Sequence, residues 1–101
     1  MVGDVEVFAE YRHVVRDHVY DKCWELDLTW AEVEDLLTQG EVVEKTDVDE
    51  LRIKYVTLVW HDRPLHLVYI VDHEQRVVIY RTIHRPDLAH WEPGFRVRKR
   101  T

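Results

Sequence analysis

Two strand-like runs near the C-terminal end of the chain carry a histidine and an arginine that can act together. The runs are residues 65–71 and 76–83, and a short polar segment connects them. A connection of two or four residues over 72–75 places His66 opposite Arg81 on the neighbouring strand, with their Cβ atoms roughly 5 Å apart. A connection of three residues would place Thr82 there instead, but it usually needs a glycine, and the segment contains none.

An arginine beside a histidine disfavours the charged imidazole and can also hold a phosphate group. The pair therefore suits general acid–base chemistry on a phosphodiester, in which one group moves a proton and the other stabilises negative charge. The alternative is structural, with His66 as a half-buried ring that bonds to a neighbouring carbonyl. The residues alone leave both interpretations open.

Basic side chains continue beyond the second run. Residues 1–80 carry 8 Lys and Arg against 18 Asp and Glu, whereas residues 81–101 carry 6 against 2. Such a basic end could contact nucleic acid, or it could fold back on the acidic body. The side chains that extend the basic surface past the second run are His84, Arg85, Arg96, Arg98, Lys99 and Arg100.

These side chains need elements to hold them, and the first is a predicted helix over residues 5–27. Apolar residues recur three and four apart along it, which is the spacing of one helix face. His18 and Lys22 lie beside that face, one helical turn apart. This helix would therefore present a histidine and a lysine together.

A second helix and a meander of strands follow. Thr29 and Glu32 match a capping box, so we expect a helix to begin at Thr29 and to stop at a left-handed Gly40. The residue pattern then changes to a period of two in 41–45, a predicted edge strand, and in 51–55. Residues 56–60 are apolar on both faces, which predicts that the second half of this strand lies deeper. Together with the two runs above, this predicts an α+β fold in which two N-terminal helices pack on a four-stranded antiparallel meander.

Composition limits the remaining possibilities. The length of 101 residues predicts a single domain over 1–101, with an ordered core at about 5–92, Trp91 as an anchor and a basic tail at 93–101. The single cysteine, Cys23, lies in an apolar helical pattern and is expected to pack in the core. No histidine pair has the spacing of metal ligands, so we expect no metal and no cofactor. The absence of a signal peptide and of a run near the ~18 apolar residues of a membrane span suggests a cytoplasmic protein without membrane contact.

Several short blocks of the chain resemble a known family. They are His18 with Lys22, the segment Gly40–Glu44, the Arg-Pro-Leu-His that opens residues 63–70, and the Thr-Ile-His-x-Pro-Asp of residues 82–87 followed by Trp91. The similarity covers about residues 12–92. It is to a family of small bacterial domains of unknown function, which is grouped with the barnase, EndoU, colicin and RelE-like ribonuclease toxins.

The resemblance implies a RelE/barnase-like fold and a metal-independent ribonuclease, often encoded beside a zinc-finger antitoxin. The family pattern places its helix histidine on His18, its basic partner on Lys22, its strand histidine on His66 and its last-strand threonine on Thr82. The chain departs from that pattern in three places: Lys22 stands for a more usual Arg, Asp62 for a frequent Gly, and His84 for a usual Tyr. The lysine lacks the bidentate phosphate contact that an arginine offers.

Two functional hypotheses follow. In the first, a toxin-type endoribonuclease uses His18 or His66 as the base and the other ring, or His84, as the acid, while Arg81 stabilises the phosphorane. The full candidate catalytic set is His18, His66, Arg81, Thr82 and His84, and the RNA-binding set is Lys22, Arg85, Arg96, Arg98, Lys99 and Arg100. In the second hypothesis, a non-catalytic domain binds a protein or dimerises through the edge strand 41–45. The expected partners are RNA, an antitoxin protein or a second copy of the chain.

Overall fold

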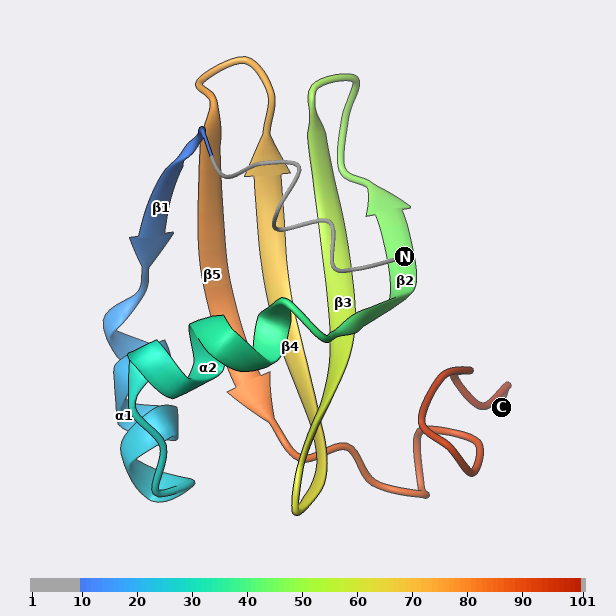
Figure 1. Ribbon diagram of the computed structural model, residues 1–101. Helices are drawn as coiled ribbons and strands as arrows, with labels where there is room; N and C mark the ends of the chain where they lie inside the picture. Colours follow the sequence, from blue (N-terminus) through green and yellow to red (C-terminus); the bar gives the residue numbers. More distant parts are fainter. Residues whose placement is uncertain (1–9, 101) are drawn as a thin grey trace.

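A computed structural model, which describes residues 10–100, shows an α+β chain with two helices and one five-stranded mixed sheet (Figure 1). The strand order is β1-β5-β4-β3-β2. The four strands β2 to β5 form the predicted antiparallel meander, but β1 adds a fifth strand that runs parallel to β5. The predicted four-stranded antiparallel sheet was therefore wrong in the number of strands and in the direction of one pair. The elements are β1 (Arg12–Val15), α1 (Asp17–Glu25), α2 (Trp30–Leu37), β2 (Glu41–Asp47), β3 (Arg52–His61), β4 (Arg63–Asp72) and β5 (Val77–His84).

The predicted helix over 5–27 is a strand followed by a shorter helix, and residues 5–9 lie outside the described residues. Arg16 has extended backbone angles, φ −67° and ψ 148°, and separates β1 from α1. Tyr11 and Val15, which belong to the predicted helical face, do pack against the core. The apolar pattern thus indicated which residues are buried, but the strand conformation depends on pairing with β5, about 65 residues away.

The second helix begins as predicted. The Glu32 amide donates to Thr29 Oγ1 over 3.2 Å, and the Thr29 amide donates to Glu32 Oε1 over 3.2 Å, which completes the capping box. Gly40 is not in the left-handed region, so its predicted role as a left-handed stop was wrong. A Cβ added at Gly40 would meet Thr57 Cγ2 at 2.6 Å, so this glycine lets the chain leave α2 close over β3.

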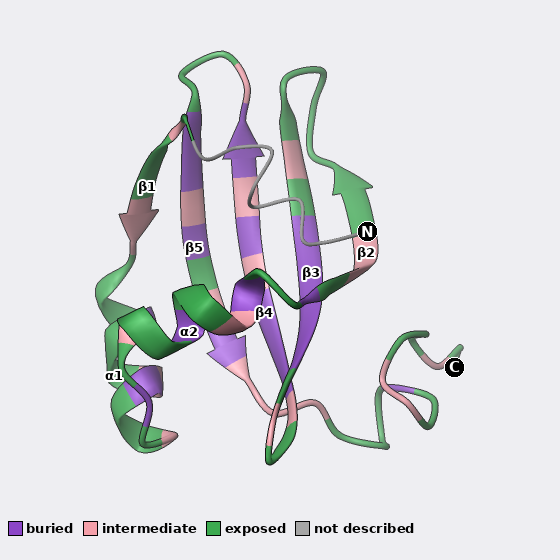
Figure 2. Cartoon of the chain, viewed as in Figure 1, coloured by how far each residue is buried: buried purple, intermediate pink, exposed green. Residues whose placement is uncertain are grey.

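The two faces of the sheet are covered differently (Figure 2). On β4, alternate residues from Leu65 to Val71 join the core that both helices bury. The intervening residues of β4, namely His66, Val68 and Ile70, lie on the opposite face, which neither α1 nor α2 covers. There, Trp91 and the rest of the C-terminal segment, residues 85–100, contact His66 and leave Val68 and Ile70 only partly buried. We call the two parts of this face the covered half and the open half.

The β4–β5 register differs from the predicted one. Asp72 pairs with Val77 across a four-residue turn in which Arg76 adopts a left-handed φ of 56°. Further along, the register shifts again, because Val68 pairs with Thr82 whereas Tyr69 pairs with Tyr80. Arg81 lies between these pairs as the extra residue of a β-bulge. His66 therefore lies opposite His84, and the predicted His66–Arg81 pair was wrong.

Candidate functional site

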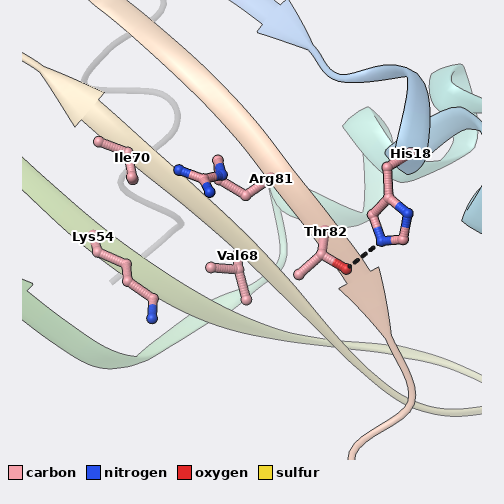
Figure 3. A pocket seen from close by; sticks show the side chains of 6 residues that line it. All are labelled: His18, Lys54, Val68, Ile70, Arg81 and Thr82. Carbon is pink, nitrogen blue, oxygen red and sulfur yellow. Dashed lines mark hydrogen bonds between the residues drawn. The ribbon is translucent and has the colours of Figure 1, made fainter.

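A cavity of about 360 Å³ lies on the open half of the helix-free face (Figure 3). Its volume falls within the range of small-molecule sites in proteins. The lining side chains come from α1, β3, β4 and β5, so four separate segments form the site. They are His18, Lys54, Val68, Ile70, Arg81 and Thr82.

The strand register explains four of these positions. Val68 and Ile70 are alternate residues of β4 and form an apolar floor. Lys54 on β3 pairs with Ile70, and Thr82 on β5 pairs with Val68, so their side chains share that face. A lysine and a threonine therefore flank the apolar floor from either side.

The β-bulge accounts for Arg81. Tyr80 and Ile83 both belong to the core on the helix side, although three positions separate them. The extra residue between them lets Arg81 and Thr82 leave the core together, and both line the cavity. In Figure 3, the guanidinium of Arg81 extends from β5 over β4 toward Ile70.

His18 reaches the cavity because β1 is short. β1 pairs only with residues 77–80, and α1 then packs beside the remainder of β5. His18 Nε2 lies 3.4 Å from Thr82 Oγ1, a long hydrogen bond whose donor depends on the histidine tautomer. Burial lowers the pKa of His84, and the charge of Lys22, one turn after His18, adds a smaller effect in the same direction. The helix thus brings His18 to the sheet face that also carries Arg81.

The electrostatic character of the cavity contrasts with that of the whole chain. Its lining contains two permanent cations and one imidazole but no carboxylate, although the chain carries 20 acidic residues against 14 basic ones. Within residues 10–100, neither Lys54 nor Arg81 forms a hydrogen bond or ion pair with another side chain. Unpaired cations beside an apolar floor can bind an anion with an apolar or aromatic part.

His66 belongs to the covered half, where it is fully buried. Its Nε2 lies 2.9 Å from the carbonyl oxygen of Phe95, so Nε2–H donates this hydrogen bond, and the Trp91 indole packs 4.3 Å from its ring. Nδ1 is buried without a hydrogen-bond partner. Burial lowers the pKa of His66, and the hydrogen bond to Phe95 only partly opposes this effect. His66 shares the sheet face of His18, but the C-terminal segment shields it from the cavity.

His84 is half-buried beside His66, with the two ring centroids 5.9 Å apart. Burial also lowers the pKa of His84. It follows Thr82 by two positions on β5, so it lies at the boundary between the open and covered halves. Of the histidines predicted for the site, His18 alone lines the cavity, while His84 is near it and His66 is covered.

Two ion pairs hold the covering segment in place. Arg96 Nε donates to Glu41 Oε2 over 2.6 Å, and Arg98 contacts both carboxylate oxygens of Glu44 at 2.9 and 3.0 Å. Arg98 lowers the pKa of Glu44, chiefly through these hydrogen bonds. The segment thus folds back on acidic residues, which was one of the two arrangements that the charge asymmetry allowed. Five of the predicted RNA-binding residues lie in this segment and outside the cavity lining: Arg85, which donates to the Pro64 carbonyl over 3.3 Å, Arg96, Arg98, Lys99 and Arg100.

Sequence reasoning missed Lys54. The alternation of side chains along residues 51–55 already predicts that Lys54 lies on the face opposite Ile53 and Tyr55. The sequence analysis did not predict the register between β3 and β4, which brings Lys54 beside Ile70 and so next to the cavity. A pairing of β3 with β4 counted from the tight turn at Asp62 would have found it. Asp62 adopts a left-handed φ of 65° in that turn.

Other predicted features concern side chains elsewhere. Cys23 is 3% exposed in the core, where burial raises the pKa of its thiol, so it packs as predicted. In the part of the chain from 10 to 100, no three His, Cys, Asp or Glu side chains are grouped as metal ligands. Neither of the helices in that part has the length and apolar character required to cross a membrane.

Comparison of the chain with protein-family models, with curated proteins and with solved structures found no match. The resemblance to toxin-like domains therefore stays a prediction. Any functional assignment has to come from the cavity itself.

Proposed function

We propose that the open half binds a phosphodiester of RNA and that the protein is a metal-independent endoribonuclease. One observation carries this proposal: an imidazole, a guanidinium and an ammonium line one cavity without a carboxylate, in a chain that is acidic overall. Negative charge on the body repels nucleic acid, so a cationic cavity would concentrate the interaction at one place. The apolar floor of Val68 and Ile70 would accept the face of a base or sugar.

The reaction would use His18 as the general base. Its Nε2 takes the proton of the 2′-hydroxyl, the 2′-oxygen bonds to phosphorus, and the bond from phosphorus to the 5′-oxygen breaks. The products are a 2′,3′-cyclic phosphate and a 5′-hydroxyl, whose proton comes from His84 or from water. Thr82 Oγ1 lies 3.4 Å from the same nitrogen, so the 2′-hydroxyl would replace Thr82 as the hydrogen-bond partner of Nε2. Arg81 and Lys54 stabilise the charge that develops on the phosphorane.

The role of His66 changes in this proposal. Because His66 is covered by Trp91 and bonded to Phe95, we assign it a structural role beneath the C-terminal segment. The likeness of the sequence blocks to a toxin family supports two additional proposals. The first is that the fold is RelE/barnase-like. The second is that the protein acts in the cytoplasm as the toxin of a toxin–antitoxin pair. The toxin role would give it an antitoxin protein as a partner.

The test is cleavage of an RNA oligonucleotide in buffer containing EDTA. We expect cleavage that needs the 2′-hydroxyl, a loss of about 10²-fold or more in His18→Ala, and about 10- to 100-fold in Arg81→Ala. Both residues are exposed, so neither variant should unfold. Arg63→Ala, which removes an exposed arginine outside the cavity lining, is the matched control. Absence of cleavage, or cleavage unchanged in His18→Ala, would contradict the proposal.

A second candidate function rests on β2. This strand is the outer strand of the sheet beside β3, as predicted for residues 41–45, so its free edge could pair with another chain. Two features limit this reading, since charged residues fill the strand and its register shifts between Val42 and Glu44. Light scattering on the same preparation distinguishes it: a dimer that cleaves no RNA would favour the interaction domain over the nuclease.

A further inference from the structure

Two large aromatic side chains of α1 are exposed to solvent, away from the cavity. Tyr20 is 50% exposed and Trp24 is 87% exposed, and they lie one helical turn apart. The buried face of the same helix is formed by Val19 and Cys23. Within residues 10–100, neither aromatic ring stacks on another ring or on a cation. An indole left this exposed on a helix surface is unusual and commonly marks an interaction site.

Each ring has a carboxylate beside it. Asp17 precedes Tyr20 by three positions, and Asp21 precedes Trp24 by three, so each pair lies on the same side of the helix. In the part of the chain that the structure covers, neither aspartate forms an ion pair. The basic residue of this helix, Lys22, lies on the cavity side and pairs with Glu25 at 3.2 Å. We call Asp17, Tyr20, Asp21 and Trp24 the aromatic–acidic stripe.

The covered half shows what completes such an arrangement. There the Arg98 guanidinium lies 4.5 Å from the centre of the Trp91 ring, while its nitrogens contact both oxygens of Glu44 at 2.9 and 3.0 Å. The planar guanidinium can stack on an aromatic face and bond to a carboxylate in its own plane at the same time. The aromatic–acidic stripe presents an aromatic ring and a carboxylate twice, as Trp24 with Asp21 and as Tyr20 with Asp17, but without the arginine.

We propose that the aromatic–acidic stripe binds an arginine-bearing segment of a partner protein. Charge complementarity supports this occupant, because residues 1–80 carry 18 acidic against 8 basic residues. The aspartates would repel the phosphates of nucleic acid, and an uncharged apolar segment would leave them without a partner. This surface is separate from the cavity, so the inference does not depend on the nuclease proposal.

The spacing of the stripe sets the geometry of the partner. Its two aromatic–carboxylate units are one turn apart, about 5–6 Å along the helix axis. Arginines at alternate positions of an extended segment are about 6–7 Å apart, and arginines four apart on a helix are about 6 Å apart. A partner segment with two arginines in either arrangement would engage both units at once.

The test is calorimetric titration of the full chain with a 12-residue synthetic peptide that carries arginine at alternate positions. We expect about tenfold weaker binding in Trp24→Ala, weaker binding in Asp21→Asn, and weaker binding of the same peptide with lysine in place of arginine. The matched control is Trp60→Ala, which removes an indole that is 54% exposed on β3, and it should bind like the wild type.

Three results would overturn the proposal. One is equal binding by wild type and Trp24→Ala. Another is a dimer in light scattering that dissociates in Trp24→Ala, which would assign the stripe to a second copy of the chain. The third is a loss of RNA affinity in Trp24→Ala without a loss of peptide affinity, which would assign it to nucleic acid. Because Trp24 is so exposed, a folding defect is not expected, and circular dichroism of each variant checks this.

Discussion

The open and covered halves of the helix-free face are built on the same strands, yet they differ in what their polar groups can do. In the open half, His18, Lys54 and Arg81 surround a cavity, and the two cations have no ion-pair partner among residues 10–100. In the covered half, His66 is buried under Trp91 and its pKa is lowered by burial. The comparison teaches that coverage by the C-terminal segment, more than residue type, decides which groups can act on a ligand.

The two halves should also differ in their contribution to stability, because buried groups stabilise the fold and exposed ones mostly do not. The largest effect is expected for Trp91→Ala, since Trp91 is 4% exposed and packs on both His66 and Arg98. Its truncation should cost about 3–5 kcal/mol of the free energy of unfolding, measured by urea denaturation. Trp60→Ala is the matched control for the loss of an indole, because Trp60 on β3 is 54% exposed, and it should cost about 1 kcal/mol or less. Equal losses in the two variants would break the comparison.

An intermediate effect is expected from pH. Burial lowers the pKa of both His66 and His84, so between about pH 6.5, the ordinary histidine value, and these lower values the unfolded chain binds more protons than the folded one. The free energy of unfolding should therefore have its highest value above about pH 6.5 and should decrease as the pH is lowered toward 5.5. The decrease is at most about 1.4 kcal/mol per pH unit for each ring. The lowered pKa of Glu44 acts in the same direction, but below the carboxyl range of about pH 4.5.

Urea denaturation at pH 7.5, 6.5 and 5.5 measures this dependence. His84→Gln should flatten it, and His18→Gln, which removes an imidazole from the open half, is the matched variant for comparison. A wild-type stability that rises as the pH falls from 7.5 to 5.5 would contradict the assignment of neutral, buried rings to the covered half.

The smallest effects are expected from single charges. Glu44→Gln weakens the bidentate contact with Arg98 in the covered half and should cost about 1 kcal/mol or less. Arg81→Ala and Lys54→Ala, in the open half, should change the free energy of unfolding by less than about 0.5 kcal/mol. If Arg81→Ala or Lys54→Ala destabilised the protein more than Glu44→Gln, the two cations would have a structural role. That result would contradict the proposal that they bind a ligand.

Much of the fold follows from local signals in the sequence. The capping box at Thr29 and the strand alternation after Gly40 predicted α2 and the four strands of the meander. The strand β1 was missed because its apolar residues fit a helical period as well, and because its partner on β5 is distant in the sequence. Parallel pairing of this kind leaves no local pattern to detect.

The candidate site was predictable as a set of residue types but not as an arrangement. His18, Arg81 and Thr82 were all proposed, and all three line the cavity. The partner of His66 depended on a turn with a left-handed arginine and on a bulge, neither of which has a clear signal in the residues. The covering of His66 depended on which acidic residues would bind Arg96 and Arg98, and such long-range choices are fixed only in the folded chain.

The bulge places Arg81 in the cavity without making it part of the strand pairing that builds the sheet. If this residue were removed, Tyr80, Thr82 and Ile83 would be consecutive, and their side chains would point alternately to the two faces of the sheet. Tyr80 and Ile83 would both still face the helices. Loss of a single codon would therefore spare the architecture while removing the guanidinium. Among related chains, the presence or absence of one residue at this point of β5 would distinguish those that keep the arginine in the cavity from those that keep only the scaffold.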